Sequence, residues 1–392
     1  MKKSSLYVYV YYTLYPSSYK RLLEDDERRR RDRRIPRPAL NKFSQSPFMH
    51  LFLSGNDQAL LNATGHDHSS FRKLLVVFEP LYDTFTWDHQ FRYIRRKKID
   101  PISGKPKGGK KRDMTACGCL GLVLMWYRTR GSCARGLSMI FGQTSSPLYL
   151  WLKFGRKVLL HILCRQPEAK VCSPSNDEVA FYTHVIGEKY PSCSDVWAAA
   201  DGLKLLIQEP TDNAKQNQLF NGWKHSHNIN CIFVFSPDGK IRFCLLNAPG
   251  TFHDSTMADY GIYEGMEEIY LRTGAKVVVD SAFKIGNKSY VVKSSQQDPE
   301  HAQDLIRNRD ATSIRQLSEW GMRMIGGSFP RLKDSLTYEE EGDRMIILRL
   351  MVHLYNFQTS QVGINQIMNT FCERNNYFGA QYNIADDANF MF

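Results

Sequence analysis

Short apolar runs and longer amphipathic stretches alternate along the C-terminal half of the chain. Three apolar runs predict β-strands, at residues 196–208, 229–250 and 275–280. Inside the second run, Ser236-Pro237-Asp238-Gly239 is typical of a β-hairpin turn. Amphipathic stretches predict helices at about 261–273, 298–327 and 339–361. Three antiparallel strands, a helix, a further strand and terminal helices together predict an α/β fold with a mixed sheet.

The N-terminal half begins with charged and loop-like segments. Residues 1–60 are expected to form a disordered or loosely packed basic arm, because 24–38 is a dense charge run followed by prolines. The part from Arg28 to Arg34 is interpreted either as a nuclear-import or phosphate-binding signal or as a solvated linker. Residues 61–112 are expected to form a short α segment and a basic loop.

The sequence pattern of residues 113–194 predicts a helical domain. Its helices are expected at 114–131, 134–143 and 145–165, the last with Ser145 as its cap and Pro147 in its first turn. A tight turn between the second and third helices is typical of a helix-turn-helix, whose last helix enters the major groove of DNA. A plain three-helix bundle that packs on the following domain is the alternative. Residues 195–361 form the strand-rich domain in this division, and 362–392 a tail.

The overall charge narrows the choice of partner. The chain carries 52 basic and 40 acidic side chains, a net charge of +12, which favours a polyanion such as nucleic acid and, with the arginine run, a nuclear location. Its nine cysteines show no repeated C-x-x-C spacing and are expected to be reduced thiols. No apolar stretch approaches the ~18–20 residues of a membrane span. Neither a Walker-type phosphate loop nor a G-x-S-x-G elbow is present, which argues against ATP-driven chemistry and serine-nucleophile hydrolysis.

Four acidic residues end apolar segments or lie on elements that aim them inward: Asp201, Asp254, Asp280 and Glu319. Asp201 closes an apolar run and is expected to open a turn at Gly202, so residues 196–208 are predicted as a pair of strands or as one strand bent at Asp201-Gly202. Carboxylate oxygens are the ligands that Mg²⁺ and Mn²⁺ prefer, and two such ions support phosphodiester cleavage. The alternative for any single acid is a turn former or a surface charge.

The order of the strands brings two of these acids together. It is the order expected of a ribonuclease H-like core, in which the first and fourth strands are neighbours, so Asp201 and Asp280 should meet. Two unpaired carboxylates at close range repel unless a cation lies between them. Glu319 follows on a late helix that has room to pass over the site. The sequence therefore predicts a divalent metal site built from the four acids.

Five stretches resemble the DDE superfamily endonucleases of PIF/Harbinger-type transposases: Asp201-Gly202 after its strand, residues 221–241, PGTFHDS at 249–255, VVDSAF at 278–283 and SEWGMRMIGGSFPRLK at 318–333. The resemblance covers about 195–357. It implies a metal-dependent nuclease that cuts DNA with a catalytic triad of Asp201, Asp280 and Glu319. It further implies that Asp254 is a fourth acid near the metal and that His253 holds a loop or a phosphate. A Myb-like DNA-binding protein and a homo-oligomer are the further partners expected.

The chain also departs from the pattern of that family. Val279 precedes Asp280 where glycine is usual, Trp320 follows Glu319 where many members have arginine, and Leu203 stands where threonine or cysteine is frequent. None of these changes removes a carboxylate. They bear on how the substrate is positioned rather than on whether a metal is bound.

Basic residues close to the acids in sequence predict contacts with phosphate. Those singled out for nucleic-acid binding are Lys224, His225, His227, His253, Arg323, Arg331 and Lys333, and Lys284, Lys288 and Arg315 also flank the last two acids. Trp223 and Trp320 either stack on a base or pack in the core. Three functions stay open: a transposase-like endonuclease, a catalytically inactive DNA-binding protein descended from one, and another hydrolase such as a ribonuclease or metal phosphatase.

Overall fold

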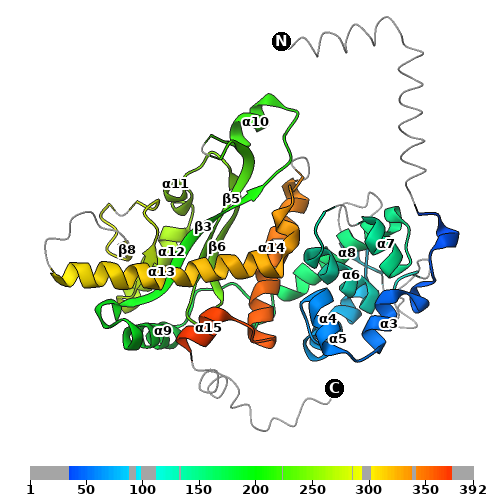
Figure 1. Ribbon diagram of the computed structural model, residues 1–392, viewed down its shortest axis with the longest axis horizontal. Coiled ribbons are helices and arrows are strands. Elements are labelled where there is room, and N and C mark those ends of the chain that lie inside the picture. Colours follow the sequence, from blue (N-terminus) through cyan, green and yellow to red (C-terminus); the bar gives the residue numbers. More distant parts are fainter. Residues whose placement is uncertain are drawn as a thin grey trace, which may run out of the picture.

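The computed structural model describes residues 35–87, 94–98, 112–131, 134–222, 224–284, 286–293, 302–337 and 341–372. An N-terminal helical part, up to residue 163, lies beside a C-terminal part built around one mixed sheet (Figure 1). The predicted arm before residue 35, most of the basic loop at 95–112 and the tail after 372 lie outside the described residues.

The sheet consists of six strands: β3 (Val196–Leu206), β4 (Phe220–Asn221), β5 (Ser226–Phe235), β6 (Ile241–Pro249), β7 (Lys276–Val279) and β8 (Val291–Lys293). Its main order is β6–β5–β3–β7–β8, with the short β4 pairing the start of β5. β5 is antiparallel to β3 and β6, whereas β7 is parallel to β3 and β8. The prediction of an α/β mixed sheet is confirmed, and so is the adjacency of its first and fourth strands.

The β5–β6 hairpin forms where its sequence predicts it. Gly239 has a φ of +79°, which a glycine adopts without strain. Asp238 is fully buried in the turn and its carboxylate lies 2.8 Å from the Arg242 guanidinium. This ion pair fixes the turn because a buried charge is tolerated where a partner compensates it.

The turn expected at Gly202 does not form. β3 continues through this glycine to Leu206, and Gly202 and Leu203 pair with Ile232 and Cys231 of β5. The local preference of Asp-Gly for a turn yields to the ladder of hydrogen bonds that β5 offers along the whole strand. The functional consequence is that Asp201 lies in the middle of a strand, not at its end.

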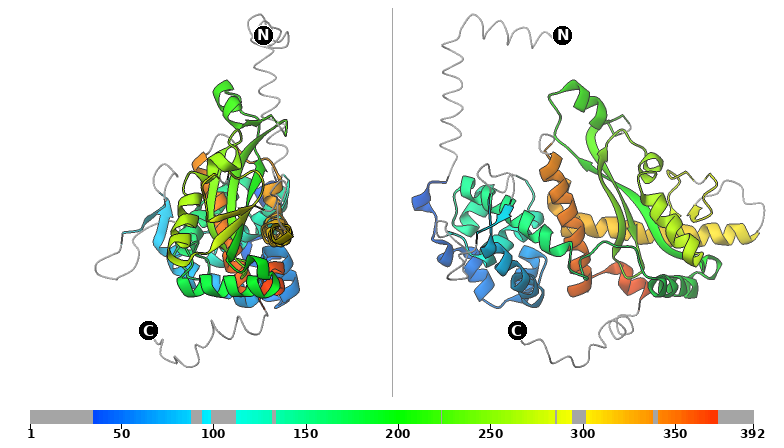
Figure 2. Two further views of the ribbon diagram at one scale, coloured as in Figure 1. Left: turned by 90° about the vertical axis from the view of Figure 1, so that its left-hand side faces the viewer. Right: turned by 180° about the vertical axis from the view of Figure 1, so that it is seen from behind.

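Helices cover both faces of the sheet. α9 (Asn176–Lys189), α11 (Asp254–Ala258) and α12 (Ile262–Thr273) pack on one face, and α13 (Ala302–Ser328) and α14 (Glu341–Gln361) on the other. The left view of Figure 2 shows α13 end-on beside the sheet. Gly321 permits this helix to approach closely, because a Cβ there would lie 2.5 Å from the ring of Phe235. The helices predicted at 261–273, 298–327 and 339–361 are confirmed.

The N-terminal part contains α3 (Pro47–Leu53), α4 (Asp57–Thr64), α5 (His68–Thr84), α6 (Ala116–Arg128), α7 (Ala134–Phe141) and α8 (Ser145–Leu163), with a two-stranded ribbon of β1 (Phe85–Trp87) and β2 (Ile94–Arg96). Phe48 and Leu60 are fully buried, so α3 and α4 are each anchored in the core where a loose arm was expected, although most side chains of residues 47–60 are not buried. Thr144, rather than Ser145, occupies the N-cap of α8. The three predicted helices between 114 and 165 are confirmed.

One hydrophobic core joins the two parts. α14 runs between the sheet and the helical part (Figure 1), and the Tyr127 hydroxyl of α6 donates to the Ile347 carbonyl of α14 at 2.8 Å. The remaining short elements are α10 (Asn213–Leu219), α15 (Gln366–Phe371) and the 3₁₀ helices η1 (Arg37–Ala39), η2 (Phe43–Gln45), η3 (Pro191–Cys193) and η4 (Pro330–Lys333). Among the described helices, none has the length and apolar character that crossing a bilayer requires.

Candidate active site

Asp201 lies on β3 with its carboxylate half-buried. The backbone N–H of Gly202 donates to its Oδ1 at 2.7 Å, which fixes the orientation of the carboxylate. The pKa of Asp201 is raised to about 6, chiefly by burial of the carboxylate. The negative charges of Asp280 and Asp254 also raise it, whereas the Gly202 hydrogen bond and the Arg315 cation oppose the shift. Burial, more than repulsion by the neighbouring acids, therefore favours the protonated form of Asp201.

Asp280 reaches the same place from the neighbouring strand. It directly follows β7, which is parallel to β3 with Val279 opposite Ala200. Asp201 follows Ala200 and Asp280 follows Val279, so the pairing of β3 with β7 places the two acids side by side. This is the meeting that the strand order predicts.

Glu319 enters from α13, and Arg315 connects it to Asp280. The Arg315 Nη2 lies 2.8 Å from Oε1 of Glu319, one helical turn away, and its Nη1 lies 3.2 Å from Oδ1 of Asp280. The guanidinium therefore lies between an acid of the sheet and an acid of the helix. From its place in the sequence, Arg315 is predicted to flank the last two acids. Its i,i+4 spacing from Glu319 indicates one of these contacts, whereas nothing local in the sequence indicates the other.

Asp254 approaches from the opposite side of β3. It is the first residue of α11, and its carboxylate packs against Gly202, where a Cβ would lie 2.7 Å from Oδ1. Alternate residues of a strand face opposite sides, so Gly202 presents the α11 face while Asp201 presents the α13 face. Burial raises the pKa of Asp254; Lys204 counteracts this effect, and Asp280 adds to it. Asp254 thus interacts electrostatically with Asp201 and Asp280 but lies on the opposite face of the sheet from Asp201.

The donor set suits a hard divalent cation, although the side chains are not arranged as its ligands. Within the described residues, no group of three or more His, Cys, Asp or Glu side chains is arranged to hold a metal ion. The guanidinium of Arg315 provides the positive charge between Asp280 and Glu319 instead. The pKa of Asp201 is raised chiefly by burial and in part by Asp280 and Asp254, and a divalent ion bound by carboxylate oxygens would favour the ionised form.

Two of the basic residues predicted to bind nucleic acid lie near the acids. Arg323 is exposed on α13, one turn beyond Glu319. His253 is exposed as the residue that precedes α11, and its charge lowers the pKa of the adjacent Asp254. Both side chains are open to a phosphate that approaches the carboxylates.

The other predicted contacts lie elsewhere. Lys224 and His225 lie in the turn before β5, and His227 lies near its start. This end of β5 pairs with the far end of β3, about 17 Å beyond Asp201 along the strand. Lys333 is exposed in η4.

Arg331 is engaged with the helical part. Its guanidinium lies 4.8 Å from the ring centroid of Trp126 and donates to the Gly131 carbonyl. Trp320 packs near Phe371, with ring centroids 6.5 Å apart, and Trp223 lies outside the described residues.

The region that contains the four acids is similar to a known protein family. Residues 200–356 match the family model described as DDE superfamily endonuclease. This range contains all four acids and Arg315, and it confirms the resemblance at the level of the superfamily. No curated protein and no solved structure matches the chain.

Proposed function

We propose that the chain is a transposase-like DDE endonuclease that cleaves DNA phosphodiester bonds, with Asp201, Asp280 and Glu319 as its catalytic acids. The observation that carries this proposal is their convergence. β3 and β7 present Asp201 and Asp280 at neighbouring positions, and α13 adds Glu319 through the shared guanidinium of Arg315. All three lie within the region similar to DDE superfamily endonucleases.

The strand order supports a ribonuclease H-like core, and the PIF/Harbinger type is proposed from the sequence resemblance. The order β6–β5–β3–β7–β8 and the mixed strand directions agree with the order that the sequence predicts for such a core. For the helical part, burial favours a bundle over a helix-turn-helix. Across the 19 residues of α8, all of them described, just Ser146 and Tyr149 are exposed, which leaves little surface for a DNA groove.

A divalent metal, Mg²⁺ or Mn²⁺, would be held by Asp201, Asp280 and Glu319, with Asp254 contributing charge from across β3. Such an ion supplies an acidified water and stabilises the leaving oxygen. The chain's own residues orient the site: the Gly202 N–H fixes the Asp201 carboxylate, and Arg315 holds Asp280 and Glu319 at one place. Arg323 and His253 are available to bind phosphates beside the acids.

A catalytically inactive, transposon-derived DNA-binding protein is the second candidate. It is favoured by one observation, that Arg315 forms ion pairs with two of the three acids. In this alternative the guanidinium permanently replaces a metal, while the fold and the net charge of +12 still serve DNA binding.

Manganese-dependent nicking of supercoiled DNA distinguishes the two functions. The full chain is compared with Asp201→Ala and Glu319→Ala, and with Asp259→Asn as a control that changes an exposed acid just after α11. Cleavage by the wild type and the control but by neither site variant supports the endonuclease. Salt-sensitive DNA binding without any cleavage by the wild type supports the inactive binding protein.

The partners follow from the same proposal. DNA is the substrate, a Myb-like protein is the expected accessory factor, and a homo-oligomer is the expected working form. Nuclear location is proposed from the net charge and from the arginine run between Arg28 and Arg34, which lies outside the described residues.

A further inference from the structure

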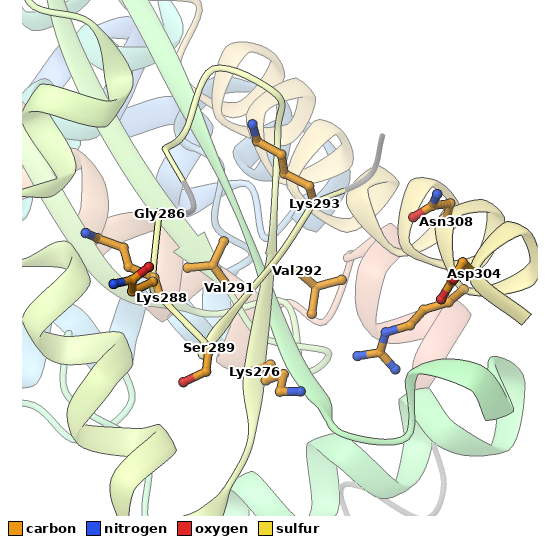
Figure 3. A pocket seen from close by; sticks show the side chains of 11 residues that line it. Lys276, Gly286, Lys288, Ser289, Val291, Val292, Lys293, Asp304 and Asn308 are labelled. Carbon is orange, nitrogen blue, oxygen red and sulfur yellow. The ribbon is translucent and has the colours of Figure 1, made fainter. Parts of the chain in front are cut away.

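A basic pocket lies along the outer edge of the sheet, between β8 and the first turns of α13 (Figure 3). Its volume is about 370 Å³. Four residues with cationic side chains line it, Lys276 and Arg307 on the α13 side of β8 and Lys288 and Lys293 on the α12 side, together with one acid, Asp304. We call this site the β8 pocket.

Two of the cations are held in place by a single carboxylate. The Lys276 ammonium lies 3.0 Å from Asp195, and Nη2 of Arg307 lies 2.9 Å from each oxygen of the same side chain. Four cations against the two carboxylates of Asp195 and Asp304 leave an excess of positive charge. This excess favours an anionic ligand.

A third cation is also positioned. The Lys288 ammonium lies 4.7 Å from the ring centroid of Tyr263, within the range of a cation–π contact. The Ser289 hydroxyl and the amide of Asn308 add neutral hydrogen-bond donors to the lining. The combination of fixed cations and small polar donors suits phosphate oxygens.

Two of these cations lie on β7 and α13, the same elements that position two of the proposed catalytic acids. β7 begins at Lys276 and is followed by Asp280, about 13 Å along an extended strand. α13 carries Arg307 and, three turns later, Glu319, about 18 Å along the helix. One strand of duplex DNA has a phosphate about every 3.4 Å of helix axis, so for a duplex whose axis runs along this separation it corresponds to roughly four or five nucleotides.

We propose that the β8 pocket binds backbone phosphates of the DNA strand that is cut at the acids, about four or five nucleotides from the cleaved bond. This inference rests on the proposed function. It assigns to the edge of the sheet a role in holding the substrate that is separate from the chemistry, because Lys276 and Arg307 lie at the ends of β7 and α13 remote from Asp280 and Glu319.

DNA binding in the absence of metal tests the pocket without requiring cleavage. The variant Lys288→Ala/Lys293→Ala removes two cations and spares the ion pairs of Asp195. Fluorescence anisotropy with a labelled duplex, over a series of salt concentrations, is expected to show about tenfold weaker binding. The slope of log affinity against log salt is expected to become shallower by about 2, since two phosphate contacts are lost.

Two further variants make the test specific. Lys189→Ala/Lys240→Ala removes the same charge from α9 and the β5–β6 turn, and it is expected to change affinity less than about twofold. Asp304→Asn removes the acid of the β8 pocket and is expected to tighten binding about threefold. Asp304→Asn keeps every cation in place, so its effect on DNA affinity does not depend on how well Lys288→Ala/Lys293→Ala folds.

The outcomes separate this inference from the proposed function. Equal affinities and slopes for the β8 pocket variant and its control overturn the pocket while DNA binding by the wild type leaves the endonuclease intact. A wild type that does not bind DNA overturns both. Ethylation of individual phosphates on a duplex with a defined cut locates the contact: interference four or five nucleotides from the cut, lost in the lysine variant, is the result expected.

Discussion

Asp280 and Glu319 share one guanidinium, although one follows a strand and the other lies on a helix. Arg315 lies 3.2 Å from the first carboxylate and 2.8 Å from the second. Each acid is therefore paired with a cation, and a metal ion that binds both must share their carboxylates with Arg315 or displace it. The arginine thus holds the acids in place and competes with the metal for them.

Arg315→Gln is expected to tighten Mn²⁺ binding several-fold, because the competing cation is lost. The metal-free variant is expected to lose up to about 1 kcal/mol of stability, a modest amount since the ion pairs are partly exposed. Titration calorimetry with Mn²⁺ and denaturant unfolding measure the two effects. Arg309→Gln, which changes an exposed arginine on the same helix, is the control. Equal Mn²⁺ affinity in all three proteins contradicts the competition.

Stability without metal is expected to fall as pH rises from about 4 to 6. The pKa of Asp201 is raised to about 6 from 3.8, so the folded protein holds a proton there that the unfolded chain releases. The stabilisation is complete below the unfolded pKa and is lost as pH rises through the folded one. A shift of about two units corresponds to at most roughly 3 kcal/mol.

Guanidinium unfolding at pH 4, 5, 6 and 7 measures this loss, which should become much smaller in Asp201→Asn and leave the part that comes from the raised pKa of Asp254. Mn²⁺ affinity is expected to rise over the same interval, because a protonated Asp201 does not bind a cation. A variant that retains the pH dependence of the wild type assigns the effect to another group.

Local signals in the sequence predict much of the sheet. The hairpin turn at Ser236–Gly239 defines β5 and β6, and the order of elements is enough to bring Asp201 next to Asp280. The helix α9 is not among the predicted helices. Its sequence does contain a signal for its start, because Ser175 and Glu178 form a capping box there.

The long-range contacts of the site have no such signal. The extension of β3 past Gly202 depends on the length of its partner β5, and the contact between Arg315 and Asp280 depends on how α13 crosses the sheet. Local preference describes a residue and its near neighbours, whereas these features are set by tertiary pairing. For this reason the sequence predicts the four acids of the candidate site but not the cation between two of them.

Asp280→Asn is expected to abolish metal-dependent cleavage and to leave DNA binding within a few-fold of the wild type. The amide keeps the size of the side chain but removes the charge that a metal ligand supplies. Nicking of supercoiled DNA and anisotropy without metal measure the two properties separately. Full cleavage by this variant is incompatible with the proposed triad.

Gly202→Ala is expected to disturb the site through packing. The added Cβ would lie 2.7–2.9 Å from the carboxylate atoms of Asp254, so either that side chain or β3 must move. Overpacking of this kind costs about 1–3 kcal/mol. Because the neighbouring Asp201 is held by the Gly202 N–H, cleavage should fall along with stability.

A second substitution separates the clash from other effects of the alanine. In Gly202→Ala/Asp254→Ala the shortened side chain makes room, so the double variant should recover stability relative to the sum of the two single changes. Gly136→Ala serves as the matched control, since its Cβ meets no atom within 4 Å and alanine favours the helix α7. Thermal unfolding of the four variants and the wild type supplies the measurement. Strict additivity of the two changes at the site means that Asp254 does not pack on Gly202 as the structure describes.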